Sequence, residues 1–279
     1  KFVPVKDPEM TMRWQRELCE RLGLKGRILI SPHGINGTLG GPIKALRQYK
    51  SQMNASVVFK DITYKWSEGG GQDFPKLKIK VKPEIVAFDA ADEIVVGEKG
   101  VENGGKHLKP AALHKMLDEK KQAGEEVIFY DGRNMYEAQI GRFKDTIIPQ
   151  TKTSRDFKKD LEEGEISKHK DKAIVTYCTG GIRCEILSAM MKNRGYDEVY
   201  QLDGGIAKYG EKFADDGLWE GKLFVFDDRM QMSFSDKAED IADCEMCGKK
   251  TSNLMNSSNV RRQLHIICKD CAEKKQVVT

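Results

Sequence analysis

The chain has 279 residues, of which 39% are hydrophobic and 32% charged, and this length predicts two or three soluble globular domains. Its longest apolar runs, such as AIVTYC and VIFY, are far shorter than the roughly 20 residues of a membrane span, which excludes a transmembrane protein. The net charge of +4 is uneven, because basic residues prevail over residues 1–100 and 244–279 and acidic residues prevail between them. This pattern fits a protein whose basic ends bind a polyanion that is processed at the centre of the chain, and it fits ordinary solvated surfaces equally well.

The first third of the sequence predicts a small α+β domain. Helices are expected at residues 7–23, where Asp7 caps a helix that opens with proline, and at residues 42–53. Strands are expected at residues 1–5, 26–31, 37–41, 57–67 and 76–88. The order β-α-β-β-α-β with one added strand predicts a ferredoxin-like domain, which we place at residues 1–98.

The second domain is expected at residues 106–220, after a polar, turn-rich linker. Strands are predicted at residues 126–133, 173–178 and 198–202, and helices at residues 109–124 and 185–196. The strands are apolar without alternation, which predicts a parallel sheet with helices on both faces. Residues 221–279 are expected to form a C-terminal extension with a small four-cysteine module.

One loop of the second domain carries the strongest chemical signal. The sequence IVTYCTGGIRCEIL places Cys178 at the end of a buried strand and Arg183 five positions later, before a helix. Ligands bind at the carboxyl ends of strands in such sheets, and backbone N–H groups there lower the pKa of a thiol. Arg183 supplies a guanidinium that can bind an anion in a bidentate manner. The residues between them are expected to form the anion cradle: Thr179, Gly180, Gly181 and Ile182.

Alternative interpretations remain open for both cysteines of this loop. A free cysteine is most often a buried structural residue, which is the alternative for Cys178. Cys184 is a candidate resolving thiol that captures an oxidised or persulfidated Cys178, or it points away into helix packing. Seven cysteines without an export signal favour a reducing cytoplasm over a disulfide scaffold.

The loop CTGGIR resembles the active-site loop of rhodanese domains, in which the cysteine carries a persulfide. The segment VIFYDGRNMYEAQIGRFKDTIIP is similar to the rhodanese pattern of a strand, then Asp-x-Arg, a Glu and Gly-x-Phe: Asp131, Arg133, Glu137, Gly141 and Phe143. Asp131 and Arg133 are expected to be supporting residues. VYQLDGG is similar to the closing Leu-x-Gly-Gly turn of the family, with Leu202, Gly204 and Gly205. The resemblance covers residues 106–216 and implies that Cys178 is the nucleophile. Cysteine phosphatases resemble this site but use five intervening residues instead of the four found here, so phosphatase is the weaker interpretation.

The flanking sequences narrow the resemblance to one family. GRILISPHGINGTLGG and YKWSEGGGQDFPKLKIKVKPEIV are similar to the N-terminal domain of bacterial rhodanese-containing tRNA uridine hydroxylases, and FVFDDR also occurs in that group. The resemblance implies conversion of the wobble uridine at tRNA position 34 to 5-hydroxyuridine, with molecular oxygen as co-substrate and the anticodon arm as partner. The sequence shows no flavin fingerprint and no haem or non-haem iron ligand set, so the oxygen chemistry follows from the resemblance alone. Many relatives carry an acidic residue where His33 stands. If that residue does chemistry, the N-terminal site of this chain is in doubt; we expect instead that it only shapes a turn.

Four terminal cysteines predict a metal centre. They form two Cys-x2-Cys pairs separated by twenty residues: Cys244, Cys247, Cys268 and Cys271. Four thiolates favour a closed structural zinc site, while an iron–sulfur cluster or a metal-free reduced form remains the alternative. His265 is expected to be a surface or packing residue. The surrounding basic residues fit either a contact to the tRNA backbone or a solvated tail: Lys249, Lys250, Arg261, Arg262, Lys269, Lys274 and Lys275.

Three hypotheses for function follow. The leading one is a cytoplasmic tRNA-modifying enzyme whose end modules hold the anticodon arm while Cys178 acts on the wobble base. The second is a plain rhodanese sulfurtransferase, which passes persulfide sulfur to a thiol or RNA acceptor. The third is a non-enzymatic RNA-binding scaffold, against which the intact Cys178 and Arg183 count.

Overall fold

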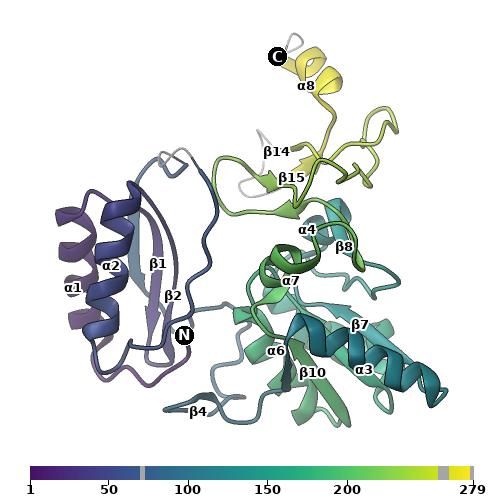
Figure 1. The fold of residues 1–279 in the computed structure, drawn as a ribbon, viewed down its shortest axis with the longest axis horizontal. Coiled ribbons are helices and arrows are strands. Elements are labelled where there is room, and N and C mark those ends of the chain that lie inside the picture. Colours follow the sequence, from purple (N-terminus) through teal and green to yellow (C-terminus); the bar gives the residue numbers. More distant parts are fainter. Residues whose placement is uncertain (70–72, 257–263, 277–279) are drawn as a thin grey trace. The chain divides into compact units, whose positions relative to one another are not determined.

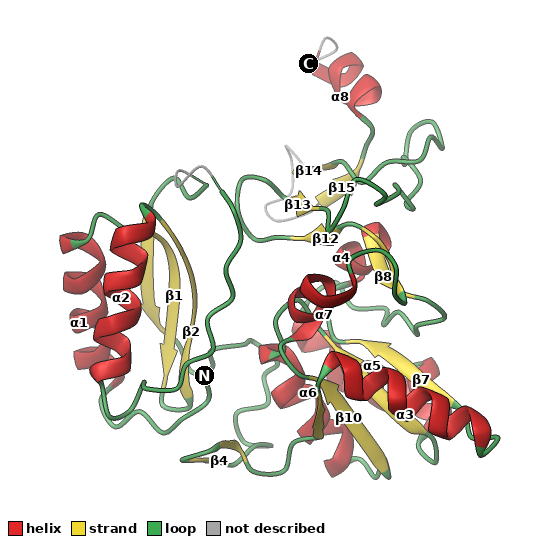
Figure 2. Cartoon of the chain, in the orientation of Figure 1, coloured by secondary structure: helices red, strands yellow, loops and turns green. Residues whose placement is uncertain are grey.

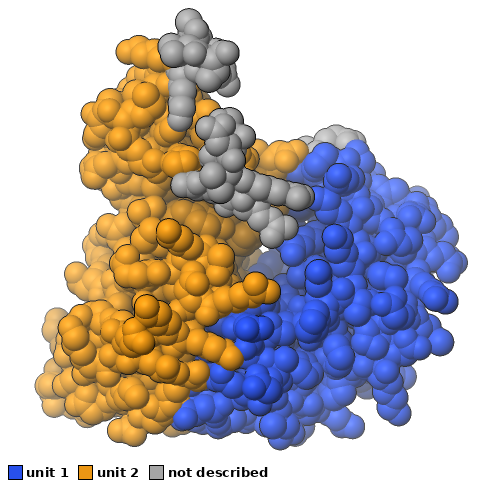
Figure 3. Space-filling model, turned by 180° about the vertical axis from the view of Figure 1, so that it is seen from behind, with its two compact units in different colours: residues 1–105, 185–193 blue, residues 106–184, 194–279 orange. Residues whose placement is uncertain are grey.

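The computed structural model describes residues 1–69, 73–256 and 264–276, with side chains up to residue 274. The chain forms two compact units, which Figure 3 shows in different colours. Unit 1 comprises residues 1–105 and 185–193, and unit 2 comprises residues 106–184 and 194–279. In the part of the chain that is described, every helix is too short or too polar for a membrane span.

Unit 1 contains the predicted α+β domain. Its elements are α1 (Pro8–Arg21), β1 (Lys25–Ser31), β2 (Gly34–Gly40), α2 (Ile43–Ala55) and β3 (Leu77–Val81). The sheet order is β2-β1-β3, with β1 antiparallel to β2 and parallel to β3. Both helices cover the same face of this sheet (Figure 1). Asp7 caps α1 by accepting the Met10 N–H at 2.8 Å, so the predicted start of this helix is confirmed.

Three strand predictions for this domain were wrong in whole or in part. Residues 57–67 form a turn and irregular backbone, because the turn buries Phe59 and leaves Val57 84% exposed, so the apolar alternation has no sheet face to fill. Residues 1–5 make an isolated bridge between Phe2 and Gly34 rather than a strand. Only Leu77–Val81 of the predicted strand 76–88 is extended in the sheet. His33 lies in the turn between β1 and β2, as expected.

The predicted linker, GEKGVENGGKH at residues 97–107, is also partly structured. It contains a short hairpin of β4 (Val96–Gly97) and β5 (Gly100–Val101) in unit 1. Its end forms most of β6 (Lys106–Leu108), which pairs with a central strand of unit 2. Three residues in a polar stretch are too few to show the two-residue alternation of a strand. β6 is therefore a strand because it pairs with its neighbour in the sheet, and not because of its own sequence pattern.

Unit 2 contains the predicted parallel sheet, which is confirmed. Its strands are β6, β7 (Val127–Asp131), β9 (Ala173–Tyr177) and β10 (Glu198–Leu202), in the order β6-β10-β9-β7. Every neighbouring pair in this order is parallel. All five residues of β9 are buried, as expected for a central strand that is covered on both faces.

Helices cover both faces of this sheet, and two neighbouring residues of β7 show it. The helices of the domain are α3 (Pro110–Gln122), α4 (Met135–Ile140), α5 (Phe157–Glu163) and α7 (Gly205–Phe213), drawn in red in Figure 2. Helix α6 (Ile182–Asn193) starts in unit 2, but its residues 185–193 group with unit 1. Phe129 belongs to a core that includes Leu113 of α3 and Ile206 of α7. The next residue, Tyr130, points to the opposite face, where its ring meets Phe157 of α5 edge-on at 6.0 Å.

The C-terminal extension consists of short antiparallel pairs. Just before it, β11 (Trp219–Gly221) pairs with β8 (Gly141–Phe143) of the preceding domain. The pairs of the extension itself are β12 (Leu223–Phe224) with β13 (Gln231–Met232) and β14 (Leu254–Asn256) with β15 (Leu264–Ile266), and α8 (Lys269–Gln276) follows them. Two 3-10 turns, Ser154–Asp156 and Glu165–His169, flank α5. A small apolar core joins this extension to α4 through Ile140, Phe224 and Ile266.

Candidate active site and metal centre

Cys178 lies directly after β9, at the carboxyl edge of the parallel sheet, and α6 starts at Ile182. The Gly181 N–H donates a hydrogen bond to the Cys178 Sγ at 3.1 Å. Gly181 has φ +92°, a left-handed conformation that favours glycine and that turns this N–H toward the sulfur. Cys178 is only 1% exposed, whereas Thr179 and Gly180 are partly exposed, so the rim of the loop meets solvent.

The turn before α7, residues 202–205, packs against the backbone of the Cys178 loop. Gly205, at the start of α7, packs so closely that a Cβ atom there would lie 2.3 Å from the Cys178 carbonyl oxygen. The same atom would lie 2.8 Å from the backbone nitrogens of Gly180 and Gly181. The N–H of Ile206 donates to the Cys178 carbonyl oxygen at 2.9 Å. The closing Leu-x-Gly-Gly turn therefore fixes the backbone that presents the sulfur.

The Cys178 thiol is held as a thiolate. Burial alone would raise its pKa, but a hydrogen bond from the Cys184 side chain and the positive charge of Arg183 outweigh this effect. Backbone N–H groups of Cys184 and Arg183 act in the same direction, and the pKa falls from the ordinary 9.0 to about 5. Dipoles and charges that surround a sulfur in this way produce a nucleophile at neutral pH.

The guanidinium of Arg183 is engaged within the protein. It forms a bidentate ion pair with Glu137 of α4, from Nη1 to Oε1 at 2.6 Å and from Nη2 to Oε2 at 2.8 Å. Nη2 also donates to the Thr179 Oγ1 at 3.1 Å. Three of the five guanidinium N–H groups are therefore used, and the charge that a substrate anion meets is already paired with a buried carboxylate. The guanidinium still borders the loop and supplies charge to the Cys178 sulfur.

Sequence reasoning gave Glu137 no role, although a local signal was present. Asn134 and Glu137 form a capping box at the start of α4, in which the Glu137 carboxylate accepts the Asn134 N–H at 3.2 Å. An Asn-x-x-Glu pattern marks a helix start and directs the glutamate side chain backward. The pattern predicts the cap but not that the same carboxylate reaches Arg183, 46 positions later.

Asp131 and Arg133, the expected supporting residues, form a buried pair at the end of β7. Arg133 donates from Nε to the Asp131 Oδ1 at 2.9 Å and from Nη2 to Oδ2 at 2.7 Å. Nη2 also donates to the Gly141 carbonyl oxygen at 2.6 Å, and the guanidinium carbon lies 5.3 Å from the ring centroid of Trp219. This arrangement ties β7 to β8 and β11. It gives the pair a supporting place in the fold beside the loop.

Cys184 lies in the first turn of α6, directly after Arg183, and its side chain is fully buried. Burial, followed by its hydrogen bond to Cys178 and the charge there, raises the pKa of Cys184 well above its ordinary value. Its Sγ also lies 3.7 Å from the Thr176 Oγ1. Of the two thiols, Cys178 is therefore the acidic one, and Cys184 keeps its proton.

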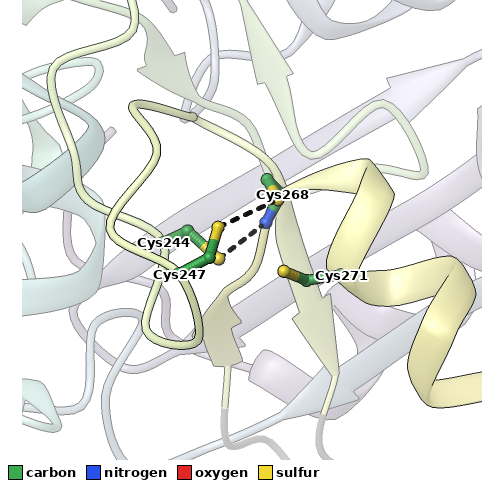
Figure 4. Close-up of side chains that lie close together, drawn as sticks. All are labelled: Cys244, Cys247, Cys268 and Cys271. Atoms are coloured by element: carbon green, nitrogen blue, oxygen red, sulfur yellow. Dashed lines mark hydrogen bonds between the residues drawn. The ribbon is translucent and has the colours of Figure 1, made fainter.

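The four terminal cysteines come together as their spacing predicts. The sulfur atoms of Cys244, Cys247, Cys268 and Cys271 all lie within 4.8 Å of one another (Figure 4). The Cys268 N–H donates to the Cys244 Sγ at 3.3 Å, and Gly248 closes the first knuckle with φ +71°. Four sulfurs at one point are the donor set of a closed tetrahedral metal site.

Several neighbours of the cysteine cluster were also assigned from sequence. His265 pairs with Glu245 through Nδ1 at 2.7 Å. Lys249 pairs with Asp270 at 2.9 Å and Lys250 with Asp243 at 2.9 Å. Arg261 and Arg262 lie outside the described residues, as does the side chain of Lys275.

Comparison with known families adds to this geometry. Three family models match successive parts of the chain: a UPF0176 acylphosphatase like domain at residues 1–85, a rhodanese-like domain at residues 109–212 and a rhodanase C-terminal region at residues 220–278. The middle match contains the Cys178 loop. The last match contains the four cysteines.

Curated proteins named tRNA uridine(34) hydroxylase are similar along nearly the whole chain. The protein of Arthrobacter sp. (strain FB24) is 54% identical, covering 99% of this chain and 94% of that protein. The protein of Corynebacterium urealyticum is 53% identical over 97% of this chain and 91% of its own length. The protein of Corynebacterium jeikeium is 52% identical, covering 100% of this chain and 89% of that protein. The chain therefore belongs to the tRNA uridine(34) hydroxylase family.

Proposed function

We propose that this chain is a cytoplasmic enzyme that hydroxylates C5 of uridine 34 in tRNA, giving 5-hydroxyuridine. The observation that carries the proposal is the buried thiolate of Cys178, held by Gly181 and Arg183 in a chain that resembles named tRNA uridine(34) hydroxylases along its full length. Position 34 belongs to a single-stranded loop, where a base can be splayed out and reach a buried group.

The proposal gives each residue of the loop a role. Cys178 is the nucleophile, and the backbone N–H groups of residues 179–183 together with Arg183 keep its sulfur anionic. Glu137 holds Arg183 in place through the bidentate pair. Asp131 and Arg133 support the backbone at the end of the neighbouring strand. Molecular oxygen supplies the new hydroxyl oxygen, and its second oxygen atom leaves as water with two electrons from a reductant.

The end modules bind the anticodon arm in this proposal. In unit 1, Lys78 and Lys80 are exposed on β3, on the opposite side of the strand from the buried Ile79. Lysines on an exposed sheet surface neutralise phosphates, which is the largest contribution to RNA affinity. In unit 2, Lys249 and Lys250 beside the cysteine cluster are also exposed, and a phosphate would replace the carboxylates of Asp270 and Asp243 as their partners.

The cysteine cluster holds structural zinc in this proposal. Its four thiol groups fit the ion in number and in type, and no fifth ligand joins them among the described residues. A closed set of four leaves no open position for substrate. The ion supplies folding energy to a module whose own core is small. Elemental analysis of the purified chain is expected to find about one zinc per molecule; iron with inorganic sulfide, or no metal, would reject the assignment.

Nucleoside analysis of tRNA tests the main proposal. A strain that lacks this gene is expected to lose 5-hydroxyuridine and its derivatives at position 34 and to regain them when the gene is restored. An unchanged nucleoside profile would reject hydroxylation.

A sulfurtransferase is the second candidate, because the rhodanese-type thiolate of Cys178 also suits persulfide transfer. Sulfur transfer from thiosulfate to a thiol acceptor by the purified chain, combined with normal hydroxyuridine in the deletion strain, would favour this candidate. A non-enzymatic scaffold predicts a third result, namely that Cys178→Ala restores full modification.

A further inference from the structure

Phe226 is an exposed aromatic residue in the FVFDDR segment. It is 56% exposed, whereas Phe224 and Val225 before it are buried. Isolated exposed hydrophobic residues are common on protein surfaces and need no explanation by themselves. Two features distinguish Phe226, namely the rigidity of its support and its position beside the Cys178 loop.

The support is the connection between β12 and β13, residues 225–230. The Val225 N–H donates to the Met230 carbonyl oxygen at 3.1 Å, and the Met230 N–H donates to the Asp227 carbonyl oxygen at 3.0 Å. Inside this connection, Arg229 pairs with the Asp227 carboxylate through Nε at 2.9 Å. The backbone that carries Phe226 is therefore closed by hydrogen bonds on both sides.

Other aromatic rings fix the orientation of the Phe226 side chain. Its ring lies perpendicular to that of Phe224, with the centroids 4.9 Å apart and an interplanar angle of 89°. Phe224 is itself held edge-on by Tyr136 of α4, at 5.3 Å and 82°. Such edge-to-face pairs favour one ring orientation, so the exposed ring surface is pre-organised rather than freely rotating.

The position of Phe226 connects it with the active loop. The guanidinium carbon of Arg183 lies 5.6 Å from the Phe226 ring centroid. The same guanidinium donates to Thr179, the residue that follows Cys178. Phe226 therefore borders the rim of the loop, and more than half of its surface stays available to a ligand that approaches the thiolate.

We propose that Phe226 is the stacking surface for the target base and positions uracil 34 beside Cys178. This inference rests on the proposed function. An exposed ring with a fixed plane matches the flat face of a nucleobase, and stacking on aromatic side chains is how proteins hold bases that leave a single-stranded loop. The nearby Arg183 charge strengthens the electrostatic attraction to a carbonyl-bearing ring. Phe226 then contacts the substrate directly, while Arg183 and Gly181 act on the sulfur.

A binding cycle with the full-length protein tests this role. Affinities are measured for a tRNA anticodon stem-loop with uridine at position 34 and for the same stem-loop with an abasic residue there. The wild-type chain is expected to bind the uridine form about tenfold more tightly, which is the size of one stacked base. Phe226→Ala is expected to bind both forms equally, with the affinity that the wild type has for the abasic form.

Three further variants keep the test independent of folding. Phe226→Leu retains an apolar side chain without a ring plane and is expected to behave like Phe226→Ala, while Phe226→Tyr is expected to restore the discrimination. Met10→Ala removes another exposed hydrophobic residue, 67% exposed on α1, and is expected to discriminate like the wild type. Melting temperatures identify any variant that fails to fold.

The outcomes separate this inference from the proposed function. Two results would overturn the stacking role, even if the deletion strain lacks hydroxyuridine. One is that Phe226→Leu prefers the uridine stem-loop over the abasic one as strongly as the wild type does. The other is that the wild type binds both stem-loops equally. If the strain keeps normal hydroxyuridine, the proposed function fails, whereas the binding cycle still reports whether Phe226 stacks on a base.

Discussion

Arg183 and Glu137 form a bidentate ion pair, with contacts of 2.6 and 2.8 Å, that joins the Cys178 loop to α4. Glu137 is fully buried and the Arg183 side chain is 10% exposed. Such a pair is costly to break, because the remaining partner keeps a buried charge without compensation. The pair also sets the electrostatics of the site, since Arg183 stabilises the Cys178 thiolate while Glu137 fixes where that charge lies.

Arg183→Met in combination with Glu137→Leu is expected to raise the pKa of Cys178 from about 5 toward its ordinary 9.0, because the charge that favours the thiolate is gone. Apolar replacement of both partners preserves stability better than removal of one, which costs about 3–5 kcal/mol. The measurement is the midpoint of the pH dependence of Cys178 alkylation by iodoacetamide, followed by mass spectrometry. Arg142→Met is the control, because Arg142 makes only long contacts of 3.4 Å to backbone oxygens. A midpoint that stays near 5 in the double variant would show that Arg183 does not control the thiolate.

Cys184→Ala is expected to raise the same midpoint by about one pH unit, because it removes a hydrogen bond donated to a charged sulfur. Cys184→Ser keeps a donor at this position and is expected to stay closer to the wild type. Mild oxidation of the wild type is expected to give a Cys178–Cys184 disulfide, as we propose for a resolving thiol in contact with the nucleophile. Sulfinic acid at Cys178 without any disulfide would rule out the resolving role.

The depressed pKa of Cys178 makes stability depend on pH. The folded thiol loses its proton at about pH 5 and the unfolded thiol at about its ordinary 9.0, so the thiolate stabilises the fold fully above pH 9. This contribution decreases as the pH falls from 9 to 5 and is absent below pH 5. Wild type and Cys178→Ala are therefore expected to differ increasingly from pH 6 to pH 8, by at most about 1.4 kcal/mol per pH unit. Urea unfolding at each pH measures this difference, and a constant difference would contradict a folded-state thiolate. Cys184, with its raised pKa, stays neutral in both states across this range.

Gly205→Ala is expected to displace the active loop, because its Cβ would lie 2.3 Å from the Cys178 carbonyl oxygen. Gly195→Ala is the matched control: both glycines have positive φ, +65° and +78°, but no atom lies within 4 Å of a Cβ at position 195. The control pays only the backbone cost of about 1 kcal/mol, whereas overpacking adds about 1–3 kcal/mol at position 205. Urea unfolding and the alkylation midpoint measure both effects. Equal losses in the two variants would mean that the loop tolerates the added methyl group.

The sequence predicted those parts of the fold whose signals are local. The run AIVTYC identifies a buried strand, the Asp7-Pro8 pair starts a helix, and the cysteine spacing brings four sulfurs together. Local signals failed where long-range contacts decide the structure. Helix α7 was missed because glycines interrupt its pattern, and Gly210 is required by packing, since a Cβ there would lie 2.2 Å from Phe234.

In the candidate site, too, local signals could be recognised in the sequence and long-range contacts could not. Cys178 and Arg183 could be assigned because strand, glycines and helix follow one another in a single short stretch. Glu137 belongs to the segment that resembles rhodanese domains, and Phe226 belongs to FVFDDR, but neither could be given a role. Each reaches Arg183 from a distant segment through a contact that the sequence does not reveal. For the same reason, the sequence predicted a guanidinium open to substrate, whereas a buried carboxylate occupies both of its Nη atoms.

The most direct measurement compares tRNA from a deletion strain that carries either the wild-type gene or Cys178→Ser, with both proteins present at equal levels. Nucleosides at position 34 are identified by mass spectrometry. The catalytic role of Cys178 predicts 5-hydroxyuridine with the wild type and unmodified uridine with Cys178→Ser. Full hydroxylation by Cys178→Ser would contradict it, because the chemistry would then proceed without the one thiolate on which the site is built.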